Sequence, residues 1–189
     1  AVAYWLVHAA REVKDARGVL IKTASTGLLA GLVASVPAGP WFWLVPLGLA
    51  LGALGDLFLA LRGERFFLAG VATFGLGHLA YASGFLLRSA ALGFDGVSVG
   101  EAGVLAGLVL LLLSTEIWLS PRTAKLRWPV RGYVLLIGLM GVAAVLVPAG
   151  QGQGLLRAGA ALFIASDLML SVQLFVTRDP GLRRRLGLL

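Results

Sequence analysis

Long apolar runs follow one another along almost the whole chain, and they constrain the fold more than any other feature. A helix needs about 20 apolar residues to cross a hydrocarbon core of about 30 Å. Six runs approach or reach this length, and a shorter one precedes them: 1–10, 19–36, 41–61, 66–87, 102–119, 130–147 and 155–176. Residues 104–113 are apolar without the alternation of a barrel strand. The sequence therefore predicts an all-α, polytopic transmembrane helical bundle that forms a single domain over residues 1–189.

The composition excludes most classes of soluble protein. Only 13% of the residues are charged, about half of the usual share of roughly 25%. The chain has no cysteine, which excludes a disulfide scaffold and a cysteine-ligated metal site. A net charge of +7 favours nucleic-acid binding only where the basic residues share a solvated face, and this chain has little polar surface. We therefore expect the lipid bilayer as a partner and no nucleic acid.

Basic residues indicate which ends of the helices face the cytoplasm. They concentrate in the connections 11–18, 62–65 and 120–129 and in the tail 177–189, whereas the opposite side has only Arg88 and Arg157. Cytoplasmic loops carry the excess of Lys and Arg, so these connections and the basic tail are predicted to be cytoplasmic. In a bacterium the protein would lie in the cell (inner) membrane. The run 1–10 is too short to span and is interpreted as the end of a first helix.

Two aspartates lie well inside predicted helices. Asp56 is about five residues from the cytoplasmic end of its segment, and Asp167 is deeper in the last one. A carboxylate in the middle of a helix cannot reach the interface, and its insertion costs about 2.5–3.5 kcal/mol. Such residues are usually functional, and both are candidate catalytic groups.

Other polar residues of the same membrane half also have structural interpretations. Lys22 can extend its ammonium group to the interface, and His78 can hydrogen-bond a neighbouring helix. Tyr81 and Tyr133 are residues of a type that often packs or lies in an interfacial belt. Gathered with the two aspartates, they also fit a site that is entered from the cytoplasmic side.

The surroundings of the two aspartates repeat a pattern. Residues 55–60 and 166–171 both read small, Asp, Leu, bulky apolar, Leu, small, and they are four predicted crossings apart. Their helices then run in the same direction, as in a parallel duplication of a four-helix unit. This predicts an eight-helix fold built as a 4+4 parallel repeat, with about seven segments present here and the first of them partial.

Several short motifs contain the polar residues of these segments. They are Lys22-Thr23, Gly55-Asp56-Leu57, Gly77-His78-x-x-Tyr81, Arg131-Gly132-Tyr133 and Leu162-Phe163-x-x-Ser166-Asp167. The set resembles the lysoplasmalogenase family, the YhhN and TMEM86-like integral membrane proteins. Their order is that of the family over roughly residues 22–171. Thr23 stands where the family usually has proline, and the last helix of the family is not present.

The resemblance implies an enzyme that hydrolyses the vinyl ether bond of lysoplasmalogen, a lysophospholipid, to a fatty aldehyde and glycerophospho-ethanolamine or -choline. The two catalytic aspartates of the family correspond to Asp56 and Asp167. The reaction protonates the β-carbon, and water attacks the resulting oxocarbenium ion. It needs one protonated carboxyl and one carboxylate, which buried neighbouring acids can supply. We expect the deeper Asp167 to be the acid and Asp56 the base.

The remaining residues of the implied site bind or orient the substrate. His78 and Tyr81 are expected to orient the water or an aspartate, and Lys22 to receive the phosphate. Tyr133 and Ser166 complete the substrate-binding set. No metal and no cofactor is expected, and the oligomeric state stays open.

Two other functions remain alternatives. Asp56, His78 and Asp167 are a plausible set of ligands for a hard divalent metal in a lipid hydrolase. Paired aspartates in a parallel duplication are also typical of a proton-coupled transporter. A structural lipid-binding protein is a third reading, but it would not need buried carboxylates.

Overall fold

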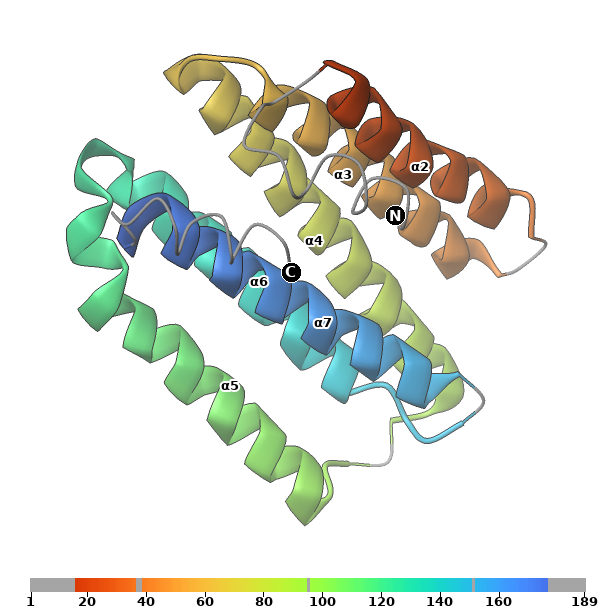
Figure 1. Ribbon diagram of the computed structural model, residues 1–189. Coiled ribbons are helices and arrows are strands. Elements are labelled where there is room, and N and C mark those ends of the chain that lie inside the picture. The colour runs from red at the N-terminus through yellow and green to blue at the C-terminus, as the bar shows by residue number, and fades with distance from the viewer. Residues whose placement is uncertain (1–15, 37–38, 95, 151, 177–189) are drawn as a thin grey trace.

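In the computed structural model, which describes residues 16–36, 39–94, 96–150 and 152–176, six α-helices are joined by short connections (Figure 1). They are α2 (Ala16–Ala34), α3 (Leu44–Ala60), α4 (Glu64–Leu92), α5 (Val99–Trp118), α6 (Arg127–Val145) and α7 (Gln153–Ser171). Shorter helical turns are η2 (Pro40–Trp43), η3 (Ser120–Arg122), η4 (Ala124–Leu126) and the π-helix η5 (Val172–Val176). No strand occurs in these four stretches, so the prediction of an all-α fold is confirmed.

Five helical stretches of the described part are long and apolar enough to cross a membrane: Trp41–Ala60, Glu64–Leu92, Val99–Arg122, Ala124–Val145 and Gln153–Val176. In α2 the apolar part is shorter, Thr23–Ala34. The predicted segment 1–10 and the basic tail 177–189 lie outside the described residues. The 4+4 repeat stays a prediction.

The fourth helix is longer than its apolar run predicts. α4 continues to Leu92, beyond the predicted end at residue 87, and therefore includes Arg88. The guanidinium of Arg88 lies over the Trp41 ring, 5.3 Å from its centroid, and this cation–π contact favours a charge at the helix end. Gly93 then ends the helix with a φ of 78°, a conformation that glycine adopts without steric cost.

The α3–α4 pair is packed at backbone distance. A Cβ atom on Gly77 would lie 3.2 Å from the carbonyl oxygen of Gly48, and one on Gly70 would lie 3.3 Å from that of Gly55. Small residues permit this close approach between membrane helices. Because the two contacts are separated by the same number of residues on both helices, they fix the register of this antiparallel pair.

The helix α4 is central (Figure 1). It packs against α3 on one side and against α6 on the other. On the side of α3, α2 packs on α3. On the side of α6, α5 and α7 both pack on α6. A core in which alanine predominates joins α4, α6 and α7, and Tyr81 and Phe163 pack against it. The buried members of this core are Ala82, Ile137, Met140, Ala143, Ala144 and Ala160.

The last described turn differs from the helix that it continues. After Ser171 the α-helical pattern of α7 changes to the π-helix η5. Within η5 the ring of Phe175 meets Phe67 of α4 edge to face, with the centroids 6.3 Å apart. This contact brings the end of α7 next to the beginning of α4.

Candidate active site

A cavity of about 280 Å³ lies among α2, α3, α4, α6, α7 and η5. Its polar lining comes from Thr26, Asp56, His78, Tyr81, Tyr133, Ser166, Asp167 and Ser171. Its apolar lining includes Leu49, Leu59, Phe67, Val71, Phe74, Val130, Phe163, Leu170, Leu174 and Phe175. A pocket that is mostly apolar, with a few convergent polar groups, suits an amphipathic molecule.

The structure brings most of the predicted site residues to this cavity. Both predicted catalytic residues, Asp56 from α3 and Asp167 from α7, are among its lining residues. The predicted orienting residues that also line it are His78, Tyr81, Tyr133 and Ser166. Lys22 belongs to α2, but its side chain lies outside the described part of the structure. The roles of all these residues stay predictions.

Three of these side chains are linked across three helices. Tyr133 of α6 donates its hydroxyl hydrogen to Oδ2 of Asp167 on α7. Its oxygen is also 3.0 Å from Nε2 of His78 on α4, and Nε2 is 3.6 Å from Asp167 Oδ2. A tyrosine hydroxyl has a single hydrogen, so the nitrogen of His78 is the donor in its bond to Tyr133. We call this group the Asp167 cluster.

The Asp167 cluster is shielded from solvent. The His78 side chain is only 1% exposed and that of Asp167 is 15% exposed. The ring of Phe163 meets the His78 ring edge to face, with centroids 5.0 Å apart. Because neighbouring rings enclose the imidazole, its position relative to Tyr133 is restricted. Among the described residues, no hydrogen-bond partner of His78 Nδ1 is found.

The two aspartates lie at different levels of the cavity. Asp56 follows Gly55, which packs against Gly70 of α4. Gly70 and His78 are separated by eight residues, about 12 Å along a helix. Side chains lean toward the N-terminus of their own helix, so those of Asp56 and His78 lean toward each other in this antiparallel pair. Asp56 and the Asp167 cluster thus both line the cavity of about 280 Å³.

The metal alternative gains no geometric support. In the described stretches no group of three or more His, Cys, Asp or Glu side chains is placed to hold a metal ion. Asp56, His78 and Asp167 line the same cavity, but they do not form such a group. The polar contacts of His78 are instead those with Tyr133 and Asp167.

Some lining residues were missed by the sequence reasoning. Thr26 is one helical turn from Lys22 and therefore on the same face of α2, a spacing that could have revealed it. Phe67 and Phe175 lie on segments that are distant in sequence, and their contact leaves no local pattern. Their pairing therefore could not be predicted.

Comparisons with known proteins add two findings. A family model described as the YhhN family matches residues 18–186. Lysoplasmalogenase TMEM86A of Bos taurus is 33% identical to this chain over 142 residues, which are 70% of this chain and 54% of that protein. The chain thus spans about half the length of this curated relative. No solved structure matches the chain.

Proposed function

The chain belongs to the YhhN family, and we propose that it is an intramembrane hydrolase that cleaves the vinyl ether bond of lysoplasmalogen. The products are a fatty aldehyde and glycerophospho-ethanolamine or -choline. One observation carries the proposal: Asp56 and Asp167, from α3 and α7, line one largely apolar cavity between helices that are apolar enough to span a membrane. The similarity to a protein named lysoplasmalogenase supports the choice of substrate.

The chemistry requires an acid and a base on the two sides of the reacting bond. A carboxyl group transfers its proton to the β-carbon of the vinyl ether, which leaves an oxocarbenium ion. Water attacks the carbon next to the oxygen, and the second carboxylate takes a proton from that water. The hemiacetal then breaks into the aldehyde and the glycerol hydroxyl. Inverting glycosidases likewise use one carboxylic acid as a proton donor and a second carboxylate to activate a water.

We assign the base to Asp167 and the acid to Asp56. Asp167 accepts the hydrogen of Tyr133 on Oδ2, and this suits a base better than an acid, which must present its own hydrogen to the substrate. His78 holds the oxygen of Tyr133, so it acts as an orienting group. This assignment reverses the expectation that was based on depth alone.

The other predicted residues complete the proposal. Tyr81 and Ser166 line the cavity and are proposed to orient the glycerol part and the water. We propose Lys22 as the ligand of the substrate phosphate, on the basis of its position in the motif Lys22-Thr23. No metal or cofactor takes part in the proposed reaction.

We further propose that the cavity is reached from the cytoplasmic leaflet. Leu59, Phe67, Leu174 and Phe175 line the part of the cavity near the α3–α4 connection. That connection, 62–65, is one of the basic connections predicted to be cytoplasmic, together with 11–18, 120–129 and the tail. In a bacterium this is the inner membrane, with a lysophospholipid of that leaflet as the substrate.

The direct test is aldehyde release from lysoplasmalogen by the purified protein. We expect Asp56→Asn and Asp167→Asn each to lose about 10²-fold or more of the rate, the usual contribution of a general acid or base. Glu116→Gln is the matched control, because it makes the same change of acid to amide on a residue that pairs with Arg131 outside the cavity. Full activity in both aspartate variants would refute the aspartate-pair mechanism.

The same preparation separates the two alternatives. A metal-dependent hydrolase would lose its activity after exhaustive chelation and regain it with added metal. A transporter would accumulate a solute in sealed proteoliposomes, and Asp56→Asn would abolish that uptake. The proposed hydrolase gives neither result.

A further inference from the structure

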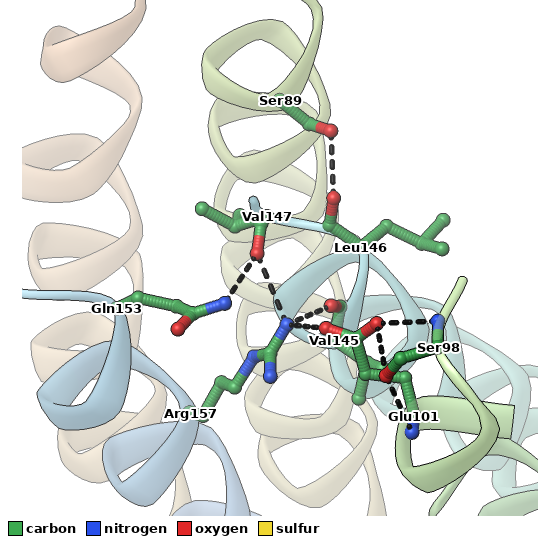
Figure 2. Close-up of polar contacts among 8 residues, drawn as sticks. All are labelled: Ser89, Ser98, Glu101, Val145, Leu146, Val147, Gln153 and Arg157. Carbon is green, nitrogen blue, oxygen red and sulfur yellow. Dashed lines mark hydrogen bonds and ion pairs between the residues drawn. The ribbon is translucent and has the colours of Figure 1, made fainter. Parts of the chain in front are cut away.

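A second polar cluster lies at the N-terminal end of α7, away from the cavity (Figure 2). Nη2 of Arg157 donates to Glu101 Oε1 on α5 and to the carbonyl oxygens of Val145, at 2.5 Å, and Val147, at 3.1 Å. Gln153 also donates to the Val147 carbonyl, at 2.8 Å. We call these contacts the Arg157 cluster.

The partners of Arg157 are the ends of two other helices. Val145 ends α6, and the last carbonyl groups of a helix have no partner within it. A cation at that end is also favourable for the helix dipole. Glu101 belongs to the capping box of α5, in which Ser98 N donates to its Oε2 at 2.9 Å. One side chain of α7 therefore joins the end of α6 to the start of α5.

Side-chain packing covers one face of α7, where Leu156, Phe163 and Ile164 are partly buried against the core. Ala160 is its sole buried residue within the described helix, and large side chains such as Leu155 (82% exposed) and Leu162 (72% exposed) face outward. Its polar attachments are the Arg157 cluster and the Asp167 cluster. They are ten residues apart, about 15 Å along the helix.

We propose that Arg157 is a positioning residue for Asp167. A helix transmits a rotation or a slide along its length, so the anchor at Arg157 also sets the angle at which Asp167 meets Tyr133. Without that anchor, α7 is held by Tyr133 and by its partly buried side chains and turns more easily, and a hydrogen bond is lost once its atoms separate beyond about 3.2 Å. A misplacement of 1 Å from a distant mutation can cost about 10²-fold in rate. The inference rests on the proposed function for its catalytic part only.

The test compares two arginines of the same end of the bundle. Arg157→Gln removes the anchor, whereas Arg88→Gln makes the same change on α4, where the guanidinium lies over Trp41. For Arg157→Gln we expect kcat for aldehyde release to fall about 10²-fold with KM within about threefold. Arg157→Lys should recover part of kcat, because it keeps the charge and donors. Arg88→Gln should change neither constant.

A second measurement needs no activity. The chain has no cysteine, so spin labels can be placed at Leu76→Cys on α4 and Leu162→Cys on α7, both of which are exposed. We expect Arg157→Gln to broaden or shift the distance distribution between the labels, and Arg88→Gln to leave it unchanged.

The outcomes separate this inference from the proposed function. An unchanged distance distribution in Arg157→Gln overturns the inference, even if the wild type proves to be an active hydrolase. A changed distribution in a protein that releases no aldehyde supports the anchor and refutes the proposed reaction. If Arg157→Gln fails to fold, Glu101→Gln is measured in its place. This change weakens the same contact without deleting the guanidinium, and it is judged by the same two measurements, kcat for aldehyde release and the distance distribution between the labels.

Discussion

The two proposed catalytic aspartates are held in place in different ways. Asp56 lies on α3, whose backbone contacts that of α4 through paired glycines. Asp167 lies on α7, whose one buried residue in the described helix is Ala160. Three further side chains of α7 are partly buried against the core, and hydrogen bonds attach the helix at Arg157 and Tyr133. The cavity therefore has one wall on α3 and α4 that is fixed by backbone contact, and another on α7 that is more adjustable. We call them the fixed wall and the adjustable wall.

This difference has a physical basis. Contact between backbones leaves no space for a change of angle, because protein interiors are close-packed and tolerate little added volume. α7 has a single buried residue in its described part, so its hydrogen bonds contribute more to keeping its angle. The fixed wall should therefore respond most to added volume, and the adjustable wall to the loss of single polar atoms.

The largest expected effect is on the fixed wall. Gly77→Leu puts a side chain against the carbonyl oxygen of Gly48, and we expect a loss of about 3 kcal/mol in the free energy of unfolding, as for other overpacked sites. Gly103→Leu on α5 is the control, since a Cβ atom there meets nothing within 4 Å. Unfolding followed by circular dichroism in detergent measures both. Equal losses in the two variants would show that close packing is not the cause.

The next largest effect is expected where Asp167 of α7 is bonded to Tyr133 of α6. Tyr133→Phe removes the partner of His78 Nε2 and the donor to Asp167. A buried group without its partner costs about 1–3 kcal/mol, so the free energy of unfolding should fall by about 2 kcal/mol. Aldehyde release should fall as well, because Asp167 then loses the hydrogen bond that orients its carboxylate. Wild-type activity in this variant would mean that the hydrogen bond does not position the aspartate.

A smaller effect is expected where α4 meets the connection between α6 and α7. Ser89 donates to the carbonyl oxygen of Leu146 at 2.7 Å. Ser89→Ala removes this bond, and we expect a loss of about 1 kcal/mol in the free energy of unfolding. The same denaturation measurement detects it, and no change would indicate that the carbonyl finds another donor.

The smallest effect is expected on the surface of the bundle. Glu116 pairs with Arg131, but its side chain is 42% exposed. Exposed ion pairs contribute little to stability, and Arg131 keeps its contact with the Trp128 ring. Glu116→Gln should therefore change neither unfolding nor aldehyde release. A clear loss of activity would place this residue in the site.

The sequence indicated the helices and the two aspartates, but it did not indicate which residues touch. Apolar runs mark helices because the bilayer requires them, and buried carboxylates stand out because they are costly. The link from His78 through Tyr133 to Asp167 joins three helices, and its residues are far apart in the chain. Such a contact depends on the angles of packed helices, which apolar runs do not specify.

The glycines illustrate the same limit. Pairs with a spacing of four occur at Gly48 and Gly52 and again at Gly103 and Gly107. A Cβ atom on Gly48 or Gly52 would meet a neighbour of α4, whereas one on the second pair would meet nothing within 4 Å. Spacing alone therefore does not tell a packed glycine pair from an outward-facing one.

Arg157 shows what charge counting leaves out. By composition it is one of two basic residues on the side opposite the basic connections. Its contacts with Glu101 and with two carbonyl groups of the α6–α7 turn give it a structural role that the positive-inside rule does not predict.

The π-helix at the end of α7 sets the direction of Phe175 in the cavity wall. Its i→i+5 pattern accommodates one residue more than an α-helical turn, and each residue of an α-helix advances the side chain by about 100°. A regular α-helix over Val172–Val176 with no residue removed would turn Phe175 away from Phe67, whereas deletion of one residue would remove the extra residue and keep Phe175 in nearly the same direction. The extra residue of this turn therefore sets where the end of α7 meets α4.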